Sequence, residues 1–140
     1  MPKDEGNNKA IEKAKKQLGK EIANCRGKAR SGRNLASAIG LPPSNMKYIE
    51  DGVNAPSPDC YAKLIEELKP PPKQRKKMDN LYVIIRNVPP PDVCKIINSN
   101  ENFFDVLRLL QDTTISDEYL EKMKSLFASF ASENLEKGEN

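Results

Sequence analysis

The chain has 140 residues, of which 37% are hydrophobic and 31% are charged, and its formal net charge is +3. This composition is typical of a mostly helical, cytoplasmic protein, and no apolar run approaches the roughly 20 residues that span a bilayer. Three widely separated cysteines and the absence of histidine exclude the usual zinc sites and catalysis by a histidine base. We therefore expect no membrane segment, no metal, no cofactor and no enzymatic activity.

The charges are distributed unevenly along the chain. Residues 1–77 contain 17 Lys and Arg against 9 Asp and Glu, which is a net charge of +8, whereas residues 78–140 contain 6 against 11, a net charge of −5. A basic first part and an acidic second part indicate a division of labour. We expect any polyanion to bind the first part.

The first predicted element is one long amphipathic helix. Residues 1–8 are polar and are expected to be disordered. From Lys9 onward, apolar residues recur at steps of three and four, which predicts a helix with one buried face that ends between Gly27 and Arg30. These apolar positions are Ile11, Ala14, Leu18, Ile22 and Cys25.

Two short helices joined by a very short link are predicted next. Ser31 is a good N-cap for the first of them, and Gly40 is expected to end it with a positive φ. Pro43 suits the first position of the second helix, where a missing N–H costs nothing, and Gly52 closes this helix. A fourth helix is expected to begin with Ser57 as its cap.

Proline runs divide the rest of the chain. Residues 70–72 are expected to form a stiff extended spacer and the boundary between two domains. A fifth helix follows and is broken at residues 89–91, and three further helices are predicted after it, the last capped by Ser116. Residues 133–140 are expected to be a disordered tail.

Because no segment alternates with period two for long, we predict an all-α fold. In this prediction residues 9–69 form a helical domain, and residues 73–132 form a small C-terminal helical extension.

The stretch from Leu18 to Leu68 resembles the lambda-repressor-like, Cro-type (XRE) helix-turn-helix family. The matching features are Leu35 and Ala36, Gly40 in the turn, Met46 and Ile49 in the core, Glu50 and Gly52 after the recognition helix, and the start Ser57-Pro58-Asp59. The resemblance implies a lambda-repressor-like DNA-binding domain. It also implies a bacterial or phage transcriptional repressor that binds a palindromic operator in double-stranded DNA as a homodimer.

In this family the third helix enters the major groove and the second crosses the DNA backbone. The resemblance therefore assigns base contacts to Pro43, Ser44, Asn45 and Tyr48, with Lys47 beside them. It assigns phosphate contacts to Ser31, Arg33, either Lys28 or Arg30, and Asn54. Arg26 and Glu50 are expected to form a structural ion pair between the first and third helices.

The chain departs from the family pattern at the DNA-facing surface. Gly32 replaces a glutamine that grips a phosphate, and Pro42 and Pro43 replace polar residues at the start of the recognition helix. Specificity is therefore expected to depend on Ser44, Asn45, Lys47 and DNA shape.

The acidic C-terminal region contains more large apolar residues than one small core needs. These residues form either the subunit interface of the homodimer or an intramolecular core, and the candidates are Phe103, Phe104, Leu107, Leu120, Met123, Phe127 and Phe130. The alternative function is an antitoxin or adaptor whose C-terminal helices bind a partner protein.

Overall fold

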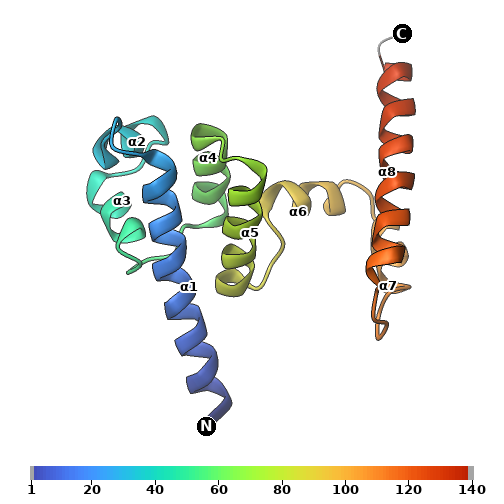
Figure 1. Cartoon of the computed structure of the whole chain (residues 1–140), viewed down its shortest axis with the longest axis horizontal. Helices are drawn as coiled ribbons and strands as arrows, with labels where there is room; N and C mark the ends of the chain where they lie inside the picture. The colour runs from blue at the N-terminus through green and yellow to red at the C-terminus, as the bar shows by residue number, and fades with distance from the viewer. Residues whose placement is uncertain (1, 139–140) are drawn as a thin grey trace. The chain divides into compact units, whose positions relative to one another are not determined.

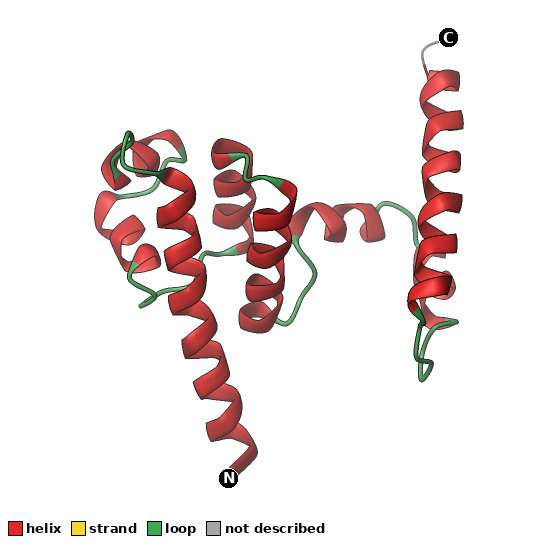
Figure 2. Cartoon of the chain, viewed as in Figure 1, coloured by secondary structure: helices red, strands yellow, loops and turns green. Residues whose placement is uncertain are grey.

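In the computed structural model, residues 2–138 are described, and they form eight helices and no strand (Figures 1 and 2). The prediction of an all-α fold is confirmed. The chain divides into two compact units, Met1–Ser99 and Asn100–Asn140. No helix in the described part of the chain is long and apolar enough to cross a membrane.

The first unit contains six of these helices and the second contains two. In the first unit they are α1 (Pro2–Arg26), α2 (Gly32–Ala38), α3 (Pro43–Glu50), α4 (Pro58–Leu68), α5 (Pro72–Arg86) and α6 (Pro91–Asn98). In the second unit they are α7 (Asn102–Arg108) and α8 (Asp117–Gly138).

One hydrophobic core holds α1 to α5 together. Helix α1 packs against α2, α3 and α5, and α2 packs against α3. The predicted apolar face of α1 is buried at Ala14, Leu18 and Ile22. The other side chains with almost no exposed surface are Leu35, Ala36, Met46, Tyr61, Leu64, Met78 and Tyr82.

The predicted domain boundary at residues 70–72 differs from the structure. Lys69 ends α4 in the left-handed conformation, and Pro72 is the first residue of α5, a position at which a proline lacks no hydrogen bond. The proline run is therefore a turn between two helices of one core. The ring of Tyr82 from α5 stacks on the ring of Tyr61 from α4, with 4.3 Å between the ring centroids.

A polar network joins α6 to the same unit. The Tyr61 hydroxyl donates to a carboxylate oxygen of Asp79 at 2.6 Å, and the Arg75 guanidinium bonds both Asp79 and Asp92 at 3.2 and 3.1 Å. Asp92 lies in the first turn of α6. The unit that begins at α1 thus continues through α6 instead of ending at residue 69.

The two ends that were expected to be disordered are helical where they are described. Helix α1 begins at Pro2, and α8 continues to Gly138, while Met1 and residues 139–140 lie outside the described part of the chain. Because a proline is tolerated in the first turn of a helix, Pro2 does not prevent α1 from including the polar residues at the start of the chain.

The structure predicts that Leu81→Ala in α5 destabilises the whole first unit. Leu81 is 7% exposed, and the cavity left by the substitution is expected to lower the free energy of unfolding by about 2–4 kcal/mol. The matched change Ile84→Ala, on the same helix but 50% exposed, should cost less than about 1 kcal/mol. Hydrogen exchange of amides in α2 and α3 during urea unfolding checks this. A loss of protection confined to α5 would instead place a domain boundary at residues 70–72.

Candidate nucleic-acid interface

Helices α2 and α3 are joined by a tight turn that fixes their relative direction. Gly40 has φ +72°, as predicted, and the Leu41 N–H donates to the Ala36 carbonyl at 2.8 Å. Ser31 caps α2 by accepting the Asn34 N–H at 3.0 Å. Ala36 is fully buried, and its small side chain fits a site where two helices lie close together. The link therefore holds the two helices as one unit beside α1 (Figure 1).

Two glycines let α1 approach the end of α3 closely. A Cβ atom at Gly19 would lie 2.5 Å from the carbonyl oxygens of both Ile49 and Glu50. A Cβ atom at Gly52, where φ is +77°, would lie 2.6 Å from the Cα atom of Lys16. These backbone contacts were not predicted from the sequence. The only feature of the sequence that pointed to such a contact was Gly19, a poor helix former inside an otherwise regular amphipathic helix.

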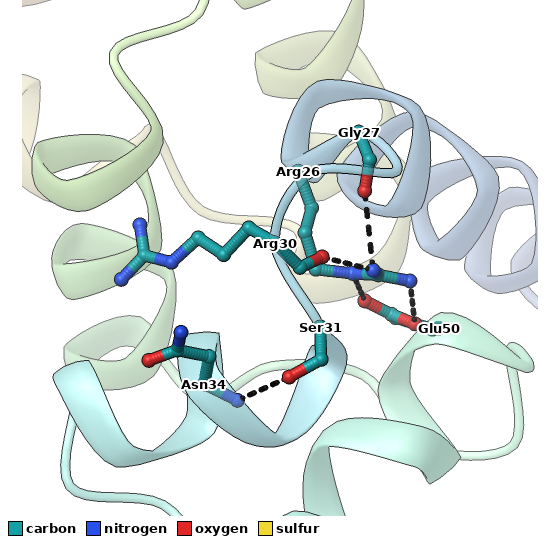
Figure 3. A network of polar contacts seen from close by, with 6 residues as sticks. All are labelled: Arg26, Gly27, Arg30, Ser31, Asn34 and Glu50. Carbon is teal, nitrogen blue, oxygen red and sulfur yellow. Dashed lines mark hydrogen bonds and ion pairs between the residues drawn. The ribbon is translucent and has the colours of Figure 1, made fainter.

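The expected ion pair between Arg26 and Glu50 is present and is bidentate (Figure 3). Arg26 Nε and Nη2 donate to the two Glu50 carboxylate oxygens at 2.7 and 3.1 Å. Arg26 Nη1 also donates to the carbonyls of Gly27 at 3.2 Å and Arg30 at 2.5 Å. The hydrogen bonds that Arg26 donates to the Glu50 carboxylate raise the pKa of Arg26. One guanidinium therefore joins the end of α1, the loop before α2 and the end of α3.

The outer face of α3 is polar and exposed. Met46 and Ile49 are buried and Glu50 is half-buried, so at 3.6 residues per turn the opposite face carries Ser44, Lys47 and Tyr48. Asn45 and Pro43 lie at the flanks of this face and are also exposed. None of the polar side chains among these five has a hydrogen-bond or ion-pair partner among the described residues. Their donors and acceptors are therefore open to a ligand.

Polar residues lie in the segments before and after α3. Ser31 and Arg33 are exposed at the start of α2, and Lys28 is exposed just before them. Asn54 is exposed in the loop after α3. Arg86 of α5 stabilises this loop by donating to the carbonyls of Ala55 and Pro56 at 3.1 and 3.0 Å, a contact that the sequence did not reveal.

The two alternatives for one phosphate contact, Lys28 and Arg30, differ in their ion pairing. Arg30 Nη2 lies 2.7 Å from a carboxylate oxygen of Glu67 on α4, so its charge is already paired. Figure 3 shows the Arg30 side chain pointing away from the Arg26–Glu50 pair. Lys28 has no ion-pair partner among the described residues. Both residues stay predicted phosphate contacts, with the difference that Arg30 would have to leave Glu67 to bind a phosphate.

Gly32, Pro42 and Pro43 lie at the starts of α2 and α3. A Cβ atom at Gly32 would lie 3.6 Å from Glu50 Oε2, so Gly32 lies directly beside the ion pair. At the start of α3, Pro43 has no N–H, and the N–H groups of Asn45 and Met46 donate to the Pro42 carbonyl. Few backbone donors are free at this end of α3, and a ligand there would meet side chains instead.

The first unit is strongly basic as a whole. It contains 19 Lys and Arg against 11 Asp and Glu, a net charge of +8, whereas residues 100–140 have a net charge of −5. Within the described residues, no group of three His, Cys, Asp or Glu side chains is placed to hold a metal ion. The electrostatics of this unit favour an anionic ligand.

The ion pair predicts a specific loss of stability when one partner is removed. Arg26→Met leaves the Glu50 carboxylate 15% exposed and unpaired, and should lower the free energy of unfolding by about 2 kcal/mol, between the values for exposed and fully buried pairs. Lys63→Met breaks the exposed pair with Asp59 and should cost less than about 0.5 kcal/mol. Urea denaturation of both variants measures the difference, and equal stabilities would show that the Arg26 contacts do not hold α3.

Comparison of the chain with protein-family models, with curated proteins and with solved structures found no match. The function is therefore inferred from the geometry of α2 and α3 and from the charge of the first unit.

Proposed function

We propose that the chain is a sequence-specific transcriptional regulator of the lambda-repressor-like, XRE type, and that it represses by binding double-stranded DNA. The observation that carries the proposal is the outer face of α3. Its polar side chains have no partner among the described residues, and it belongs to a helix that the Arg26–Glu50 pair and the core hold in place. A rigid helix with free donors on its outer face is what major-groove reading requires.

In this proposal α3 lies in the major groove and its side chains contact base edges. The Asn45 amide has a donor and an acceptor in the geometry that pairs with adenine N6 and N7. Ser44 and Lys47 supply further donors, and the Tyr48 ring, which is 48% exposed, supplies an apolar contact for a thymine methyl group. The two prolines before Ser44 reduce the number of base-reading side chains, so the deformability of the DNA contributes to specificity.

The phosphate contacts come from the segments on either side of α3. Lys28, Ser31 and Arg33 precede it and Asn54 follows it, so the contacts reach the backbone on both sides of the groove. The Ser31 oxygen accepts the Asn34 N–H, but the Ser31 hydroxyl hydrogen stays available for a phosphate. These contacts are not specific for sequence, and together with the net charge of +8 they supply affinity.

A single α3 covers one half-site, and one half-site binds weakly. Regulators that use this motif gain affinity and specificity from two copies on a palindromic operator. The proposed regulator is therefore a homodimer.

A second candidate function is favoured by a separate observation. Large apolar side chains of α7 and α8 are exposed, as expected of an antitoxin or adaptor that binds a partner protein. A different protein that co-purifies with the chain and protects residues 100–138 from proteolysis would favour this candidate.

The salt dependence of binding to a random-sequence duplex tests the proposed function. A dimer that neutralises about 6–10 phosphates should lose roughly 10³–10⁵ in affinity between about 50 and 200 mM salt. Arg33→Ala should weaken binding and reduce the slope of log K against log salt by about one per protomer. Arg108→Ala, the same change in the acidic second unit, is the control and should leave the slope unchanged. A decrease of less than about tenfold in the wild-type affinity over this range would contradict the proposal.

A further inference from the structure

The second unit contains many apolar side chains but no core. Between residues 100 and 135, where side chains are described, no residue is buried. Eight large apolar side chains are each 39–66% exposed, namely Phe103, Phe104, Leu107, Tyr119, Leu120, Leu126, Phe127 and Phe130. A segment of this size without buried side chains lacks the hydrophobic stabilisation that keeps helices folded in water. Its helices therefore need a surface to pack against.

Six of the seven large apolar side chains of α8 lie on one side of the helix. At about 100° per residue they fall within an arc of about 120°, and Leu135 near the end of the helix lies outside it. The members of this apolar arc are Tyr119, Leu120, Met123, Leu126, Phe127 and Phe130. A wide apolar arc of this kind is typical of a helix that packs against other helices. A helix surrounded by water alone is usually polar on all sides.

The described charges of α8 lie outside the apolar arc and are partly paired with one another. Glu118 pairs with Lys122 at 3.4 Å and Glu121 with Lys124 at 3.7 Å, each within one turn. Between residues 117 and 135, the four acidic and two basic side chains of α8 therefore all lie on its other sides. Two copies of the arc can meet without bringing like charges into contact.

The exposed area matches what a stable dimer needs. An aromatic side chain presents on the order of 200 Å² when bare, so complete burial of the exposed half of the five aromatic ones removes about 500 Å² per copy, and the three leucines add to this area. A stable protein–protein interface buries about 800 Å² on each partner. When two copies meet about a twofold axis, the apolar surface of each copy covers the same surface of the other.

We propose that the apolar arc of α8, with Phe103, Phe104 and Leu107 of α7, is the interface with a second copy of this chain. The choice of a second copy rests on the proposed function, because two half-site readers must be joined. The two α8 arcs pack against each other and share the α7 side chains as a common core. The acidic second unit joins the copies, and each basic first unit stays free to bind DNA.

The mass of the full chain in solution tests this interface directly. Wild type should sediment as a dimer of the 15.7 kDa chain. Phe127→Glu places a charge within the arc and should weaken self-association about a hundredfold or more. Ser129→Glu adds the same charge about 60° outside the arc, on the side of α8 opposite Phe127, where Ser129 is exposed, and should leave the dimer intact.

Circular dichroism and urea unfolding of the first unit show whether Phe127→Glu acts at the interface or by general unfolding. A monomeric wild type, or equal effects of Phe127→Glu and Ser129→Glu, would overturn the proposal, and so would a stoichiometric complex with a different protein at this surface. A dimeric wild type that binds no DNA would refute the proposed function but not the interface. A monomeric wild type that still binds DNA would refute the interface and the homodimer, but not DNA binding by the first unit.

Discussion

The bidentate ion pair between Arg26 and Glu50 is the contact on which the orientation of α3 relative to α1 depends. Helices α2 and α3 have seven and eight residues, and helices this short are not stable in water without tertiary contacts. The core supplies most of these contacts through buried apolar residues. The Arg26 guanidinium adds direction, because its planar fork fixes the end of α3 relative to α1 and to the loop before α2. The backbone contact at Gly19 sets the distance between α1 and α3.

The two units have opposite charge and opposite degrees of burial. The first unit has a continuous core and a net charge of +8, so it folds around its own apolar residues and presents cations to an anionic ligand. The second unit has a net charge of −5 and no buried side chain between residues 100 and 135. We propose that association with a second copy of the chain covers its apolar surface. In this proposal, ligand binding and assembly use different units of the chain.

Local signals in the sequence predicted much of the fold. The apolar spacing of α1, the caps at Ser31 and Ser57 and the positive φ of Gly40 follow from interactions within a few residues, and they are all present. The prolines at residues 70–72 were interpreted as a domain boundary, because sequence alone does not show that Met78, Leu81 and Tyr82 complete the core of the preceding helices.

Within the candidate site, the sequence predicted the exposed residues of α3 and, through a family resemblance, the partners Arg26 and Glu50. It did not predict that Arg30 pairs with Glu67 or that Arg86 bonds the loop after α3. Both contacts join residues about thirty or more positions apart, and no periodic pattern or short motif encodes such a pair.

The most direct measurement of DNA binding by α3 is a map of backbone amide shifts as duplex DNA is added to the full chain. The amides that shift should be those of residues 43–48, of residues 28–33 and of Asn54, while those of α7 and α8 stay unchanged. Shifts confined to the second unit or to the basic start of α5, or no shift at all, would contradict DNA recognition through this helix.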